Sequence, residues 1–251
     1  MTEKDGFGCC VLDEVWNDLT FDFTEEVRDK WRRLICQKYM DGARHHHNLD
    51  HLSHMMGLFR TYQDYLSNPK AVAFALFFQF LEYDPKSQDN EERCIEAFRQ
   101  FADEARIPMD SELFLTVTEL IQLTKLHSTE EHKQEGIYGS EDRHFFLDFD
   151  MCVLGGSPSE YKDYAQKIRL EYSFVPDHLY NRLRSKILTS FLQIPNIFAT
   201  EPFRRKFEER AKSNIKAEIE MLTSVHTYKH ELCGRKDKTC CMMMLACYGI
   251  S

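Results

Sequence analysis

Apolar side chains recur at helical spacing along nearly the whole chain. In residues 24–40, Val27, Trp31 and Ile35 fall on one face and charged residues on the other, which is the pattern of an amphipathic helix. Thr24 is placed to cap this helix, because a Thr hydroxyl can accept a hydrogen bond from a backbone N–H of the first turn. The same period predicts further helices over 47–66, 91–105, 111–127, 160–174, 177–192 and 201–222.

Residues 71–83 are apolar almost all round. Their length, their alanines and the helices on both sides favour a buried central helix over a buried strand. A clear start signal stands at Ser157-Pro158-Ser159-Glu160. Ser157 and Glu160 can form a capping box, and Pro158 suits the first helical position.

No repeat and no low-complexity linker divides the chain. The pattern therefore predicts an all-α, single-domain helical bundle over residues 24–224. Residues 1–23 are expected to form an N-terminal lead-in. The helical period ends near residue 225, so residues 225–251 are expected to form a Cys-rich tail.

Composition narrows the class of protein. The chain has 251 residues, of which 43% are hydrophobic, enough for a sizeable core. Its net charge of -9 argues against coating a nucleic acid, but it is compatible with a small phosphorylated ligand held by a few local cations. No apolar run reaches the roughly 18 residues of a membrane span, and the start of the chain lacks the apolar core of a secretion signal. Nine scattered cysteines indicate reduced thiols, so a cytoplasmic location is expected.

Two segments carry candidate chemistry. His47 and His51 stand one helical turn apart and could present two imidazoles to one point, as metal sites on helices require. A solvated, His-rich helix start is the alternative interpretation. Further along, Asp148 and Asp150 lie in an apolar frame. Burying carboxylates there is costly without a cation or hydrogen-bond donors, so these acids indicate a site.

These motifs occur together in the order of a known family. The matching stretches are residues 44–51 (Arg-x-Tyr-His-Asn-Leu-x-His in the family), 77–83 (Trp-Phe-His-Asp-x-Val-Tyr), 89–91 (Asp-Asn-Glu), 147–155 (Leu-Asp-x-Asp-Leu, then Leu-Gly) and 164–172 (Tyr-x-x-x-Ile-Arg-x-Glu-Tyr). Over residues 25–222 the chain resembles a bacterial-type branch of the HD-domain metal-dependent phosphohydrolases. A series of short motifs in the right order is more specific than any one of them.

The resemblance implies an HD-type helical bundle with a divalent metal (Mn, Fe, Co, Ni, Mg or Zn) bound by a His, an adjacent His-Asp pair and a later Asp. By position, His51 and Asp150 match the first and last ligands, and His127 is a further candidate. The resemblance also points to groups that would hold a phosphorylated ligand or act on it. The ligand-binding candidates are Arg44, His47, Asn48 and Arg169, and the catalytic candidates are Glu91 and Asp84. An Arg fork suits phosphate, although a surface salt bridge or a helix cap explains such arginines equally well.

The chain departs from the family at its defining pair, where Gln79 and Phe80 replace His and Asp. Phe80 cannot ligate a metal, and the Gln79 amide is a weak ligand for hard cations. We therefore expect a degenerate site that binds a small phosphorylated or nucleotide-like molecule with little or no hydrolysis. Two alternatives stay open. One is an active phosphohydrolase with replacement ligands, and the other is an interaction or scaffold protein with a protein partner.

The tail offers weaker signals. His226, His230 and Cys233, followed by Cys240 and Cys241, are residue types that can bind zinc, but their spacing matches no regular finger. Basic residues before the paired cysteines would suit reversible acylation. A flexible tail without either role is the third interpretation.

Overall fold

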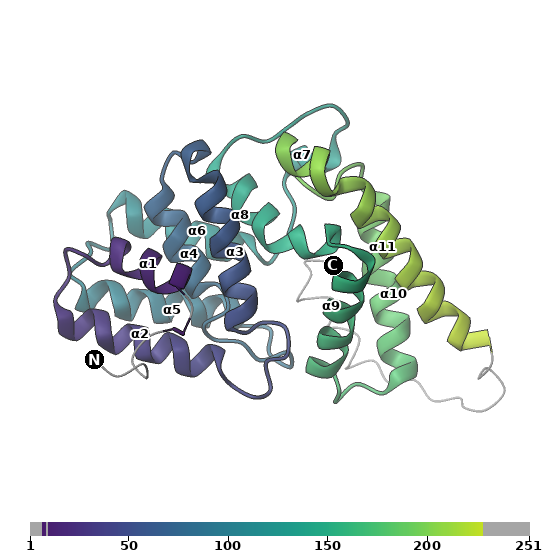
Figure 1. The fold of residues 1–251 in the computed structure, drawn as a ribbon, viewed down its shortest axis with the longest axis horizontal. Helices are drawn as coiled ribbons and strands as arrows, with labels where there is room; N and C mark the ends of the chain where they lie inside the picture. The colour runs from purple at the N-terminus through teal and green to yellow at the C-terminus, as the bar shows by residue number, and fades with distance from the viewer. Residues whose placement is uncertain (1–6, 9, 228–251) are drawn as a thin grey trace. The chain divides into compact units, whose positions relative to one another are not determined.

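The computed structural model describes residues 7–8 and 10–227, with side chains as far as residue 224 (Figure 1). Across this part of the chain the structure is all-α, as predicted, and its β structure is limited to one isolated bridge between Gly139 and Thr200. The helices are α1 (Cys10–Leu19), α2 (Glu25–Tyr39), α3 (Leu49–Tyr62), η1 (Gln63–Tyr65), α4 (Pro69–Phe78), α5 (Asn90–Glu104), α6 (Glu112–Leu123), α7 (Glu130–Lys133), α8 (Asp142–Met151), η2 (Cys152–Gly155), α9 (Pro158–Glu171), α10 (Asp177–Gln193) and α11 (Glu201–Thr227). None of these helices has the length and apolar character needed to cross a bilayer.

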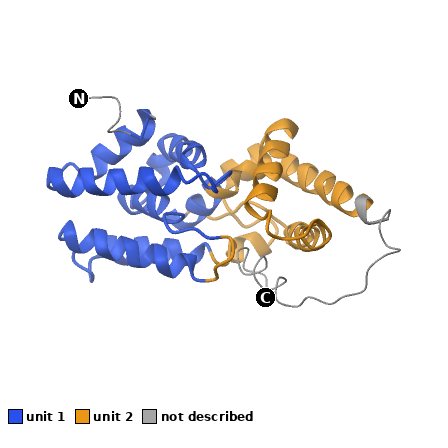
Figure 2. Cartoon of the chain, turned by 90° about the horizontal axis from the view of Figure 1, so that it is seen from below, with its two compact units in different colours: residues 1–84, 89–124, 141–149 blue, residues 85–88, 125–140, 150–251 orange. Residues whose placement is uncertain are grey.

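The chain divides into two compact units (Figure 2). Unit 1 consists of residues 1–84, 89–124 and 141–149, and unit 2 of residues 85–88, 125–140 and 150–251. Neither unit is one continuous segment of the sequence.

The core of unit 1 is built around α4. Every residue of this helix from Ala71 to Phe78 is buried, and α4 packs against α1, α3, α5 and α6. Its aromatic side chains pack in close pairs, for example Phe78 with Phe98 at 5.1 Å between ring centroids. Helix α1, in the segment predicted as a lead-in, buries Val15 and Trp16 and contacts α3 and α4. The central buried helix of the prediction is thus present.

Unit 2 is built around the long helix α11, which packs against α10 and η2. A buried ion pair joins α10 and α11. In it, Arg184 Nε on α10 donates to Glu218 Oε1 on α11 at 3.0 Å. The short helix η2 approaches α11 very closely at Gly155. A Cβ placed on Gly155 would lie 2.5 Å from the Cβ of Phe207.

Local start signals act as predicted. The Thr24 hydroxyl accepts from Val27 N at the start of α2, and Ser157 and Glu160 form the capping box of α9. One boundary differs from the prediction, because α4 ends at Phe78 and not near residue 83. Past that point, the carbonyls of Phe80 and Leu81 accept hydrogen bonds from the Arg44 guanidinium. These two carbonyls are therefore bonded to a side chain and not to backbone N–H groups of a continuing helix.

Candidate functional site

Three imidazoles gather in unit 1, at the start of α3. We call His46, His47 and His51 the histidine cluster. The ring centroid of His46 lies 4.2 Å from that of His51 and 4.8 Å from that of His47. His46 and His51 are buried, and His47 is half-buried. The structure thus brings together the two histidines that the helical spacing singled out and adds His46, which the spacing did not indicate.

Asn48 positions this cluster. Its side-chain oxygen accepts from the backbone N–H groups of Asp50 and His51, and its amide nitrogen donates to the carbonyl of His45. Asn48 is therefore the N-cap of α3. The Asn48 side chain, predicted to contact a ligand, is thus already bonded to the first turn of α3. It fixes where this helix begins and thereby the position of the His51 backbone.

Gln79 and Phe80, which stand where the resembled family has its His-Asp pair, lie in the turn after α4. Gln79 is buried, and its amide nitrogen donates to Met55 Sδ at 3.1 Å. Its amide oxygen is buried, with no hydrogen-bond partner among the described residues. The Phe80 ring lies 4.6 Å from the His47 ring and 6.0 Å from the His51 ring. This donor set does not fit a divalent metal, since one side chain has no lone pair and the other points its nitrogen at a thioether.

Arg44 places a buried positive charge beside the cluster. Its two terminal nitrogens donate to the carbonyls of Phe80 and Leu81. The guanidinium carbon lies 5.7 Å from the centroid of the Tyr83 ring, and the His47 ring packs on the same Tyr83 at 4.3 Å. Arg44 therefore organises the turn and supplies charge, but its outer fork is occupied by backbone carbonyls.

The two catalytic candidates lie in unit 1. Asp84 is exposed, and its backbone N–H and carbonyl bond to the side chain of Asn90. Glu91 is half-buried in the first turn of α5. The nearby carboxylate of Glu82 forms ion pairs with Lys38 at 2.6 Å and Arg93 at 3.0 Å. This neighbouring acid, which a metal site with replacement ligands could have used, is thus already engaged with cations.

His127 and Asp150 belong to unit 2, and the structure brings them together. His127 Nε2 lies 3.8 Å from Asp150 Oδ2, with both side chains largely buried. His127 follows the end of α6 with a φ of 48°, a left-handed conformation that is uncommon for residues other than glycine. The two residues were predicted from motifs more than twenty positions apart, so this pairing supports a shared role. Asp148, two residues earlier on α8, is fully buried.

Arg169 closes the end of α9. It donates to the carbonyls of Tyr172 and Val175 and to the carboxylate of Asp177, the last at 2.6 Å. Its guanidinium carbon lies 4.6 Å from the Tyr180 ring centroid. These bonds hold the turn between α9 and α10, so the helix-capping interpretation of this arginine fits its surroundings.

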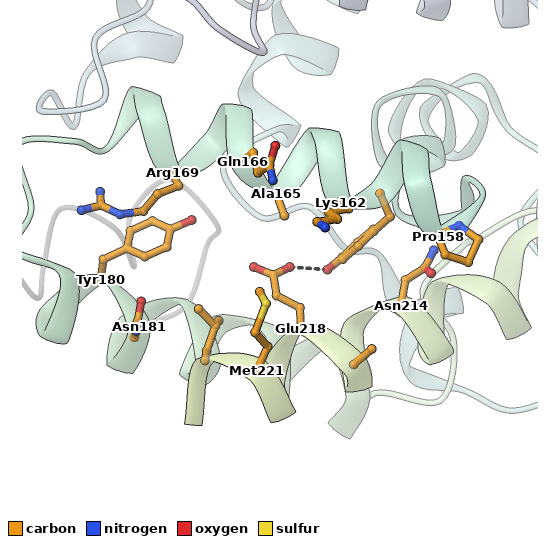
Figure 3. A pocket seen from close by; sticks show the side chains of 13 residues that line it. Pro158, Lys162, Ala165, Gln166, Arg169, Tyr180, Asn181, Asn214, Glu218 and Met221 are labelled. Carbon is orange, nitrogen blue, oxygen red and sulfur yellow. Dashed lines mark hydrogen bonds between the residues drawn. The ribbon is translucent and has the colours of Figure 1, made fainter. Parts of the chain in front are cut away.

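Sequence reasoning missed a cavity of about 510 Å³ in unit 2, between α9, α10 and α11 (Figure 3). Its walls are largely apolar, and its floor carries Glu218, whose carboxylate accepts from the Tyr161 hydroxyl at 2.5 Å. Burial raises the pKa of the Tyr161 hydroxyl well above its ordinary range. The only sequence signals were Tyr and Glu residues on the apolar faces of helices, which are ordinary features of a helical core.

Among the described residues, no three His, Cys, Asp or Glu side chains are grouped so as to hold a metal ion. The candidate zinc ligands of the tail from His230 onward lie outside the described residues, and so does its candidate acylation segment. Comparison with models of protein families, with curated proteins and with solved structures finds no match to this chain.

Proposed function

We propose that this chain is an HD-type, phosphohydrolase-like protein with a degenerate metal site, which binds a small phosphorylated or nucleotide-like ligand with little or no hydrolysis. The observation that carries this proposal is the packing at the replaced pair. Gln79 bonds to Met55, and the Phe80 ring lies against His47. A metal at this wall would have lost two ligands, while the imidazoles opposite are kept.

The chemistry of the histidine cluster supports an anionic ligand. Imidazole N–H groups donate hydrogen bonds to phosphate oxygens, and a protonated imidazole adds charge. The buried charge of Arg44, above the same Tyr83 ring on which His47 packs, favours an anion further. Tyr83 and Phe80, both half-buried beside the cluster, add aromatic surface against which a planar base can pack.

Titration calorimetry with AMP, ATP and inorganic phosphate tests the binding. We expect a nucleotide to bind the native chain, and His47→Ala to weaken binding about tenfold, the loss of one hydrogen bond to a charged group. The matched control is His54→Ala, since His54 is exposed on the same helix α3. It should bind like the native chain. Equal losses in the two variants would contradict the assignment of the site.

Metal analysis of the purified protein separates the two alternatives. An active enzyme with replacement ligands would contain stoichiometric Mn, Fe, Co, Ni or Zn and would hydrolyse bis(p-nitrophenyl) phosphate. His51→Ala or Asp150→Ala would remove that metal. A variant with Ser at Cys233, Cys240 and Cys241 controls for metal held by the tail. If neither metal nor any phosphorylated probe binds, the interaction or scaffold alternative replaces the proposal.

A further inference from the structure

The cavity of unit 2 is a candidate site separate from the histidine cluster. It lies between α9 on one side and α11 on the other, with Tyr180 of α10 at one end (Figure 3). Its volume of about 510 Å³ falls within the range of small-molecule sites. All of its described lining residues belong to unit 2.

The charges around the cavity favour an anion over a cation. Glu218 is the carboxylate of the floor, and both of its oxygens already accept hydrogen bonds from Arg184. Arg169 is likewise compensated, since it pairs with Asp177. Lys162, exposed at the rim, has no ion-pair partner among the described residues. Among the described residues that line the cavity, the one charge without an ion-pair partner is therefore positive.

Tyr180 supplies a second, independent observation. Its side chain is 2% exposed, and its hydroxyl has no hydrogen-bond partner among the described residues. Figure 3 shows this hydroxyl directed between α9 and α11, while the Arg169 guanidinium covers the ring. A buried hydroxyl without a partner is unfavourable. A ligand oxygen in the cavity would accept its hydrogen bond. Burial raises the pKa of Tyr180 to about 12, so the hydroxyl keeps its proton at neutral pH and can donate.

We propose that the cavity between α9, α10 and α11 binds a small amphipathic carboxylate, with an apolar body between the two helices and an anionic head. The body would contact apolar wall groups such as Ala165, Ala217 and Leu222. The head would accept a hydrogen bond from the buried Tyr180 hydroxyl, and the exposed Lys162 ammonium at the rim would add a counter-charge at longer range. This site uses none of the residues of the histidine cluster, so either proposal can fail without the other.

Three probes with the same twelve-carbon chain test the class of ligand. Dodecanoate, dodecanol and dodecyltrimethylammonium are titrated into the full chain below their micelle concentrations, with binding followed by calorimetry. We expect dodecanoate to bind most tightly, dodecanol more weakly and the cation weakest of all. Equal or tighter binding of the cation, or no binding of dodecanoate, would overturn the proposal.

Substitutions then locate the site. Tyr180→Phe should weaken dodecanoate binding about tenfold, because it removes a hydrogen bond to a charged group. Lys162→Gln should weaken it up to about fivefold, as expected for an exposed ion pair, and should leave dodecanol unchanged. Lys167→Gln is the matched control, since Lys167 lies on the same helix but pairs with Asp163 outside the cavity.

A filling variant guards against indirect effects. Ala217→Trp places a large ring in the cavity and should abolish binding of both dodecanoate and dodecanol. Circular dichroism confirms that each variant is folded. If Ala217→Trp folds and still binds dodecanoate with native affinity, the ligand binds elsewhere and the proposal is wrong.

Discussion

At the scale of single residues, Gln79 is a polar side chain held inside an apolar core. Its side chain is buried, with the amide nitrogen on a thioether and the amide oxygen without a partner among the described residues. A thioether is a weak acceptor, so this amide gains little from its one bond. At this position the chain keeps a polar group that its surroundings scarcely satisfy.

Replacing Gln79 tests this description by urea unfolding. Gln79→Leu should leave the free energy of unfolding unchanged or raise it by up to about 1 kcal/mol, because it removes an unsatisfied buried amide. Gln79→Glu should lower it by several kcal/mol, because the new carboxylate would be removed from water and the nearby Arg44 already bonds to the carbonyls of Phe80 and Leu81. Gln100→Leu, at an exposed position of α5, is the control and should stay within about 0.5 kcal/mol. A large loss in Gln79→Leu would show that the amide is needed.

At the scale of elements, buried polar contacts and close approaches decide how the helices of unit 2 pack. Arg184 is 1% exposed, and its guanidinium bonds to both oxygens of Glu218, so α10 and α11 are joined through a charged pair in the core. The helical period predicted both helices. It did not predict this pair, because a charged residue on a helix is solvated far more often than buried.

Breaking this pair should be costly. Arg184→Met leaves the Glu218 carboxylate buried without its cation, and we expect the free energy of unfolding to fall by about 3–5 kcal/mol. Adding Glu218→Leu should recover much of that loss, because the remaining charge is removed as well. Arg182→Met, exposed on the same helix, serves as the control. A double variant less stable than Arg184→Met would contradict the explanation.

The approach of η2 to α11 makes Gly155 sensitive to one added methyl group. That methyl would lie 2.5 Å from Phe207 Cβ and 3.0 Å from the Phe207 carbonyl oxygen, so one of the two elements must shift. We expect Gly155→Ala to lower the free energy of unfolding by about 1–3 kcal/mol, the usual cost of overpacking.

The control is Gly57→Ala, which should instead raise the free energy of unfolding by up to about 1 kcal/mol. Gly57 is exposed within α3 with open space around it, and Ala is the better helix former. Thermal unfolding of the two variants provides the comparison.

At the scale of the whole molecule, buried acids with raised pKa values make stability fall at alkaline pH. Burial raises the pKa of Tyr180 from 10.0 to about 12 and that of Cys94 from 9.0 to about 12. In the unfolded chain both groups have their ordinary pKa values, 10.0 for the Tyr180 hydroxyl and 9.0 for the Cys94 thiol, so they lose their protons at lower pH. The native state therefore binds more protons above pH 9, and its stability falls as pH rises towards 12.

Urea unfolding between pH 8 and 11.5 measures this effect. The Tyr180 contribution is fully present below pH 10 and is lost as pH approaches 12, so Tyr180→Phe should flatten the decline between pH 10 and 11.5. The comparison uses the slope with pH, which a constant loss of stability does not alter. If the variant and the native chain show the same slope, the Tyr180 hydroxyl ionises as readily in the folded protein as in the unfolded one.

The sequence by itself determined the local structure. The helical period and the signals at Thr24 and Ser157 predicted the all-α class and the start of two helices, because a helix start depends on residues within one turn of it. The loss of a metal-binding pair at Gln79 and Phe80 rests on a family resemblance and stays a prediction. That such a chain binds a phosphorylated ligand stays a prediction.

Only the tertiary structure decided how these elements divide and what lies between them. The two units share one helical period and no linker separates them, so no local signal marks their boundary. The contacts of Arg44 with the carbonyls after α4, of Phe80 with His47, and of Arg184 with Glu218 join residues 33 or more positions apart. Contacts of that kind follow from packing, and a periodic pattern read one segment at a time does not specify them.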